Sequence, residues 1–170
     1  MSGESLAFER DIAVRPEDID QLGHVNNVTY VRWIQDMAVA HWTAIAPEAD
    51  QKKLLWIVLR HEIDYKQPAF AGQKLIGRTW VGKASRLKFE RHTEFLRKDD
   101  RALLAKARTI WCPVDPSTTR PVQVSPEVRA LFAQKPDAVE KLSRDVPTRF
   151  GGDHKCSPAA RQSPITRLIA

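Results

Sequence analysis

The chain has 170 residues, 42% of them hydrophobic and 28% charged, a composition that suits a single globular domain and excludes wholesale disorder. The formal net charge of +6 invites a nucleic-acid partner, but acids and bases interleave along the chain, so we expect no nucleic acid to bind. No apolar run of about 18 residues occurs and the N-terminus lacks the apolar centre of a signal peptide, which predicts a cytoplasmic protein with no membrane partner.

The first part of the chain is predicted to form a strand and then a long helix. Apolar and polar side chains alternate over residues 8–14, the pattern of a half-buried strand, and Pro16 ends it. Apolar residues then recur at three- and four-residue spacing. Neither Gly nor Pro occurs between His24 and Ala46, and Pro47 lies just past this segment, so a helix of about five turns is predicted.

Four further strands are predicted after a polar linker at residues 48–53. Because short turns join most of them, we expect an antiparallel sheet with the helix across one face, an α+β fold. Ser125 opens a short predicted helix, and we assign residues 1–135 to one domain and residues 136–170 to a largely flexible C-terminal extension. The predicted strands cover residues 54–65, 74–83, 87–95 and 103–114.

The segment from Asp18 to Trp33 places polar chemistry directly in front of the predicted helix. It reads Asp-Ile-Asp-Gln-Leu-Gly-His-Val-Asn-Asn-Val-Thr-Tyr-Val-Arg-Trp. Asn26 or Asn27 suits the N-cap, and the free amides of the first turn, at the positive end of the helix dipole, form a site for a negatively charged oxygen. A carboxylate such as Asp20, held before that helix end, can attack a polarised carbonyl or activate a water to do so.

This motif and the order of the elements resemble the hotdog-fold acyl thioesterases, most closely the branch of the 4-hydroxybenzoyl-CoA thioesterases. The likeness covers about residues 5–134, and the segment Ile63-Asp64-Tyr65-Lys66-Gln67-Pro68-Ala69 adds a softer match after the second strand. The resemblance implies a long central helix wrapped by a five-stranded antiparallel sheet, in a homodimer or homotetramer with the site at the subunit interface. It also implies hydrolysis of an acyl-CoA substrate without a metal or other cofactor.

The resemblance further implies roles for individual residues. Asp20 matches the acid that acts as nucleophile or general base, and the Asn27 backbone amide falls where the family's helix end polarises the thioester carbonyl. His24 belongs to the matching His-Val-Asn-Asn signature and is predicted either to orient the site or to transfer a proton directly. The predicted substrate contacts are Asn26, Tyr30, Lys83 and Arg86. Tyr30 suits the protein core as well as a wall of the substrate site, and the basic residues Lys83 and Arg86 also suit a solvated surface.

The chain departs from the acyl-acyl carrier protein (acyl-ACP) thioesterases at two positions. Leu22 stands where those enzymes carry an Asn between the acid and the His, and Pro68 stands near their additional Glu. These differences favour a mechanism centred on Asp20 and the helix end, with acyl-CoA as the substrate. Hydrolysis of acyl-ACP, and acyl-CoA binding without catalysis, stay open as alternatives, and the sequence does not predict the acyl group.

Overall fold

The computed structural model describes residues 7–133 and confirms the predicted order of a strand, a long helix and four strands. The extension predicted at residues 136–170 lies outside the described residues. The elements are β1 (Phe8–Ala13), the short 3-10 turn η2 (Pro16–Asp18), α1 (Asn27–Ile45), α2 (Glu48–Lys53), β2 (Leu55–Tyr65), β3 (Lys74–Ala84), β4 (Phe89–Arg97), β5 (Leu103–Val114) and α3 (Pro126–Leu131).

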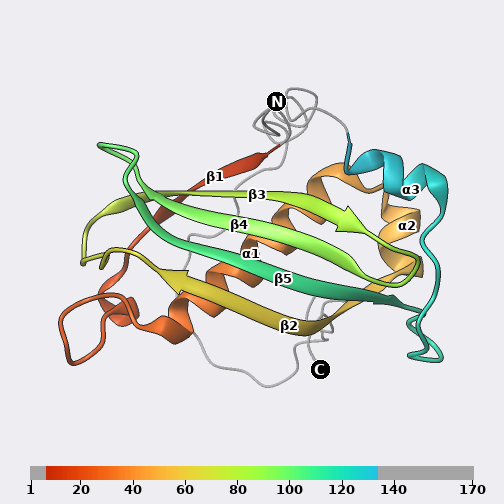
Figure 1. Cartoon of the computed structure of the whole chain (residues 1–170), viewed down its shortest axis with the longest axis horizontal. Helices are drawn as coiled ribbons and strands as arrows, with labels where there is room; N and C mark the ends of the chain where they lie inside the picture. The colour runs from red at the N-terminus through yellow and green to blue at the C-terminus, as the bar shows by residue number, and fades with distance from the viewer. Residues whose placement is uncertain (1–6, 134–170) are drawn as a thin grey trace, which may run out of the picture.

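All five strands belong to one antiparallel sheet in the order β1-β3-β4-β5-β2. Figure 1 shows α1 crossing one face of this sheet, with α2 and α3 together at one end and the loop before α1 at the other. The predicted α+β architecture, a long helix against a five-stranded antiparallel sheet, is therefore confirmed. No helix within residues 7–133 is long and apolar enough to cross a membrane.

The segment predicted to be a polar linker is the short helix α2, so that prediction was wrong. Its charges explain the helix: Glu48 and Asp50 lie in the first turn, and Lys52 and Lys53 in the last, each at the end where the helix dipole attracts its charge. The carboxylate of Glu48 and the ammonium of Lys52, one turn apart, also lie 2.6 Å from each other. Since α2 has only six residues and buries none, it leaves no apolar periodicity in the sequence.

The N-terminal half of α1 packs into a first core cluster in the middle of the sheet. Alternation along β4 points Phe95 toward α1 rather than to solvent. Gly77 of β3 allows the close approach, because a Cβ there would lie 2.8 Å from the sulfur of Met37. The helix is therefore held tightly on the sheet, and its N-terminal end has a fixed position. The largest fully buried side chains of this cluster are Ile34, Met37, Leu75, Phe95 and Leu104.

The C-terminal half of α1 packs into a second cluster built mainly of aromatic rings. Trp42 lies edge-on to Trp56 at 5.6 Å and stacks on Phe132 at 5.7 Å. Two buried polar side chains accompany these rings: Nη1 of Arg91 donates to Nδ1 of His41 at 2.9 Å. Burial, and secondly the charge of Arg91, lower the pKa of His41 to about 3, so its imidazole is neutral.

Acid should destabilise this fold through His41. Because the folded-state pKa of about 3 lies below the ordinary value of 6.5, the unfolded chain binds a proton that the folded chain excludes between these pH values. The contribution of the neutral His41 to the free energy of unfolding is fully present at neutral pH. It is lost as the pH falls from 6.5 toward 3, by up to about 1.4 kcal/mol per pH unit. Urea unfolding of the wild type, near neutral pH and near pH 4.5, measures this loss.

The matched variant is His41→Gln, which keeps an acceptor for Arg91 but cannot titrate. Its free energy of unfolding should decrease less than that of the wild type over the same pH interval, because every other acid and base is common to both chains. Equal losses in the two proteins would contradict the role assigned to His41.

Candidate active site

The loop between η2 and α1 is a closed turn that presents a carboxylate. Ile19 and Val25 form an antiparallel bridge across its base. Within it, the amide of Asp20 donates to the His24 carbonyl at 3.0 Å. Gly23 makes the turn possible, because its φ of +81° lies in the left-handed region that other residues resist. Backbone contacts within the loop therefore help to hold the position of Asp20.

Asp18 is a buried structural anchor beneath this loop. Its side chain is 1% exposed, and its Oδ1 pairs with the guanidinium of Arg32 on α1. Its Oδ2 accepts from the Arg15 amide at 2.9 Å, and its backbone carbonyl accepts from the Asn26 amide at 2.8 Å. One residue thus joins the start of the loop, the N-cap and the second turn of α1. This arrangement fixes the loop relative to the helix end.

Asp20 has one carboxylate oxygen held by the backbone and the other turned toward His24. Oδ1 accepts from the Leu22 amide at 2.8 Å. Oδ2 lies 3.8 Å from Nδ1 of His24, within ion-pair range but too far for a hydrogen bond, and the Asp20 side chain is 19% exposed. No residue within 7–133 donates a hydrogen bond to Oδ2. An oriented carboxylate with one open oxygen is what a general base or nucleophile requires.

The N-terminal end of α1 supplies a free backbone donor. Asn26 is the N-cap, and its side-chain oxygen accepts from the Val28 amide at 2.9 Å. The Thr29 amide donates to the Asn26 carbonyl at 3.0 Å. The amide of Asn27, the first helical residue, donates to no residue that the structure describes. The structure therefore decides between the two Asn residues: the first caps the helix and the second carries the free N–H.

Tyr30, a predicted substrate contact, is buried in the first core cluster. Burial, and secondly the neighbouring Tyr65, raise the pKa of its hydroxyl to about 12. The two rings meet edge-on at 5.4 Å, and Tyr65 is 50% exposed, with its hydroxyl 3.5 Å from the carbonyl oxygen of Asn27. The sequence match included the segment around Tyr65 but did not single out this residue. Only strand pairing in the folded chain brings the end of β2 to the start of α1.

Large exposed apolar side chains gather near the same helix end. Val28 lies in its first turn, and Leu22 in the loop before it. Phe70 follows Ala69, whose carbonyl accepts from the Val25 amide at 2.8 Å and so ties this segment to the loop. An exposed apolar surface next to an oriented carboxylate is typical of a ligand site or a subunit interface.

Lys83 and Arg86, the remaining predicted substrate contacts, are exposed at the end of β3 and in the turn after it. Figure 1 shows this turn at the end of the molecule where α2 and α3 lie, opposite the loop that contains Asp20. The fold of the single chain therefore does not bring these two basic residues together with Asp20. Their contact with a substrate stays a prediction.

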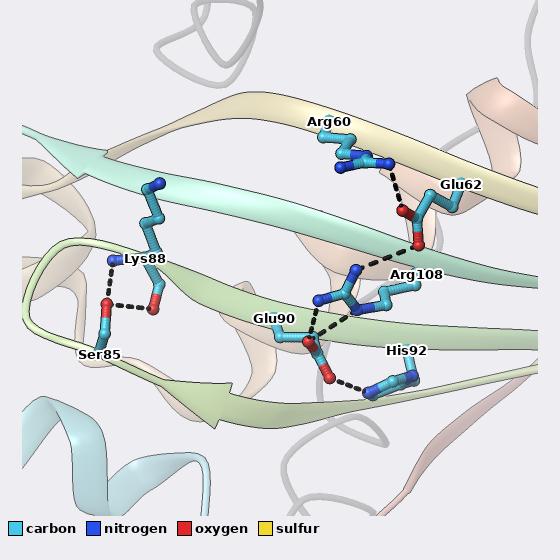
Figure 2. A network of polar contacts seen from close by, with 7 residues as sticks. All are labelled: Arg60, Glu62, Ser85, Lys88, Glu90, His92 and Arg108. Atoms are coloured by element: carbon cyan, nitrogen blue, oxygen red, sulfur yellow. Dashed lines mark hydrogen bonds and ion pairs between the residues drawn. The ribbon is translucent and has the colours of Figure 1, made fainter.

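The face of the sheet that points away from α1 carries a charge network linking β2, β4 and β5. Figure 2 shows Arg108 between two acids, with its Nε 2.7 Å from Oε2 of Glu90 and its Nη1 3.1 Å from Oε2 of Glu62. The bond from Arg108 is the largest cause that lowers the pKa of Glu90, which also contacts Nε2 of His92 at 2.7 Å. Glu62 and Glu90 therefore form ion pairs that link the strands of the sheet. Within residues 7–133, no group of His, Cys, Asp or Glu is arranged to hold a metal ion.

Comparison with known proteins identifies the family. Residues 14–132 match the family model of the thioesterase-like superfamily. The chain belongs to this superfamily. Over 157 residues it is also 20% identical to the chloroplast palmitoyl-acyl carrier protein thioesterase of Cuphea hookeriana, an alignment that covers 85% of this chain and 38% of that protein. The chain thus spans well under half the length of this relative.

Solved structures of thioesterases share the fold of this superfamily member. A 1,4-dihydroxy-2-naphthoyl-CoA thioesterase from Synechocystis superposes with a TM-score of 0.65 at 16% identity, covering 75% of this chain and 96% of its own. A probable thioesterase from Escherichia coli gives a TM-score of 0.64 at 19% identity, covering 75% and 97%. The predicted hotdog fold is confirmed, and so is the resemblance to its thioester hydrolases.

Removing the buried carboxylate of Asp18 should weaken the fold around the site. In Asp18→Ala, the Arg15 amide and the Arg32 guanidinium both lose their acceptor, a loss that we expect to cost about 2–3 kcal/mol of unfolding free energy. Urea unfolding measures the loss, with Asp36→Ala, at an exposed acid of α1, as the control that should change stability by less than about 0.5 kcal/mol. An Asp18→Ala variant as stable as the control would disprove the anchoring role.

Proposed function

We propose that this protein hydrolyses an acyl-CoA thioester to a free carboxylic acid and coenzyme A. One observation carries the proposal: the loop that holds Asp20 is joined through Asp18 to the start of α1, where the Asn27 amide has no acceptor within residues 7–133. Membership of the thioesterase-like superfamily supports the reaction type. No step of the reaction requires a metal or another cofactor, because the carboxylate and the amide supply its base or nucleophile and its oxyanion donor.

The Asn27 amide stabilises the charge that develops during the reaction. As a nucleophile adds to the thioester carbon, negative charge grows on the carbonyl oxygen. An N–H at the positive end of α1 binds that oxygen more strongly in the transition state than in the substrate. Because the helix is already packed on the sheet, the donor needs no rearrangement. One such donor typically contributes on the order of 10²–10³ in rate.

Asp20 supplies the attacking chemistry by one of two routes. As a nucleophile, its open oxygen bonds to the thioester carbon, the coenzyme A thiolate leaves, and water then hydrolyses the mixed anhydride. As a general base, it accepts a proton from the water that attacks the same carbon. His24, with Nδ1 3.8 Å from Oδ2 of Asp20, either orients this carboxylate or passes a proton to the leaving thiolate.

Coenzyme A is the favoured carrier of the acyl group, and acyl carrier protein is the second candidate. Leu22, which is 72% exposed, gives the loop no polar side chain where acyl-ACP thioesterases use an Asn. Two observations favour the second candidate: the similarity to the Cuphea hookeriana protein, and the net charge of +6, which suits an acidic carrier protein.

We also propose that the protein is a cytoplasmic homodimer or homotetramer. Strand β2 is an edge of the sheet, and Leu59 within it is 52% exposed. An unpaired edge with an exposed apolar side chain favours pairing with a second copy. Because Tyr65 ends β2 beside the start of α1, assembly along this edge would bring the second subunit next to the Asp20 loop.

Neutralising Asp20 should abolish most of the activity. Because the amide in Asp20→Asn neither attacks a carbonyl nor accepts a proton from water, we expect kcat to fall by about 10²-fold or more. Release of free thiol from short, long and aromatic acyl-CoAs measures the effect, with Asp99→Asn in the β4–β5 turn as the control of equal charge.

The outcomes of this assay separate the candidate functions. Turnover of acyl-ACP but of no acyl-CoA would replace the proposed carrier with the second candidate. No turnover of either substrate class would indicate a binding protein without catalysis. Activity that persists in Asp20→Asn would move the catalytic group elsewhere.

The oxyanion role can be tested at Asn27 by removing only its N–H. Proline is favoured at the first position of a helix, and the N-cap Asn26 already has φ −62° and ψ 138°, which a following proline accepts. We therefore expect Asn27→Pro to fold normally, yet to lose on the order of 10²-fold or more in kcat. Asn27→Ala, which keeps the amide, is the matched control and should retain most of the activity. Equal activity of the two variants would sink the oxyanion assignment.

A further inference from the structure

A cavity lies between the C-terminal half of α1, the sheet and the residues after α3. Figure 1 shows this end of α1 opposite the loop before the helix. About 360 Å³ of space free of atoms lies in the cavity, a volume that includes open solvent. One charged side chain, Arg91, lines it. Its other main walls are the rings of Trp42, Trp56, Phe89, Trp111 and Phe132.

Arg91 is an unusual group for this position, because no acid within residues 7–133 pairs with its buried guanidinium. The side chain is 6% exposed and lies on the face of β4 that points toward α1. Its Nη1 contacts the Thr79 hydroxyl at 3.2 Å and the neutral imidazole of His41 at 2.9 Å. No carboxylate within residues 7–133 forms an ion pair with it. A buried guanidinium that has only neutral partners attracts an anion.

The aromatic walls also contain donors without acceptors. The indole N–H groups of Trp56 and Trp111 are both buried and bond to no described residue. A buried donor without a partner costs free energy that a bound acceptor can recover. A second cation, Arg129 of α3, lies 4.9 Å from the centre of the Phe89 ring, and no side chain lining the cavity is acidic. Within residues 7–133, the rings around this apolar space therefore carry unpaired donors, and its one charged lining side chain, Arg91, is a cation.

We propose that this cavity is a second ligand site, which binds a small carboxylate with a short apolar or aromatic body. The carboxylate pairs with the Arg91 guanidinium, and the body packs against the rings of Trp42, Trp56 and Trp111 that line the cavity. Pairing neutralises the buried charge, and burial of the apolar body against the rings adds to the affinity.

The proposed site is separate from the candidate active site. Ala38, which lines the cavity, lies eleven positions after Asn27 along α1, a rise of roughly 16 Å. The fully buried side chains of the first core cluster, among them Ile34 and Phe95, fill the space between. Binding in the cavity therefore does not depend on thioester hydrolysis.

The test uses the full chain and two probes, hexanoate and benzoate. Three of the protein's tryptophans line the cavity, so occupancy should change the tryptophan fluorescence. We expect a saturable change with each acid at millimolar or lower concentration and a higher midpoint of thermal unfolding. Hexan-1-ol and benzyl alcohol, which match the apolar bodies but lack the charge, should bind at least about tenfold more weakly.

Two variants separate this cavity from any other site. Arg91→Met replaces the buried charge by an apolar side chain of similar length, a change that buried charged positions often tolerate, and should weaken both acids at least about tenfold. Val81→Phe keeps Arg91 but fills part of the cavity, and should abolish the fluorescence change. Asp20→Asn is the control for binding at the candidate active site and should bind both acids as the wild type does.

Several results would overturn the proposal: no saturable binding of either acid, equal binding of the matched alcohols, or wild-type affinity in both cavity variants. Loss of binding in Asp20→Asn would also overturn it, because the acids would then occupy the candidate active site. Absence of thioesterase activity would refute the proposed function but not this site, since the fluorescence and unfolding measurements involve no substrate.

Discussion

The packing of α1 across one face of the sheet is the contact on which the other features of this molecule depend. The strands present a continuous apolar face, and within the described residues α1 is the one helix long enough to cover it. Because Gly77 lets α1 approach β3 closely, the helix has one well-defined position. Its free N-terminal amide is then held rigidly, and an oxyanion donor needs that rigidity to act without rearrangement.

The two ends of α1 are built from different chemistry. At the N-terminal end, the buried Asp18 joins the loop to the helix through an ion pair with Arg32. Asp20 lies in this loop, and one of its carboxylate oxygens accepts no hydrogen bond from the described residues. At the C-terminal end, aromatic rings and the pair of Arg91 and His41 leave a cavity that is positively charged and incompletely filled. The core between them separates the two regions.

Local patterns in the sequence predicted a large part of the fold because those patterns repeat. Strand alternation, the three- and four-residue spacing of α1 and the Pro and Gly residues at the turns each act over a few neighbouring positions. The short helix α2 was missed because six exposed residues produce no such repeat. Arg91 was visible as a charged residue on the apolar side of a predicted strand, but that pattern could not show whether an acid would meet it.

The sequence by itself determined the fold class, the family and the motif with Asp20, His24 and two Asn residues at the start of a helix. Only the tertiary structure decided that Asn26 caps the helix, that Asn27 keeps its amide free, and that Tyr65 reaches this helix end from β2. It also placed the β3–β4 turn, next to Lys83 and including Arg86, at the opposite end of the molecule from the loop before α1. The physical reason is range: propensity and capping act between residues a few positions apart, whereas a site and a cavity are made by residues that only packing of the sheet and the helix brings together.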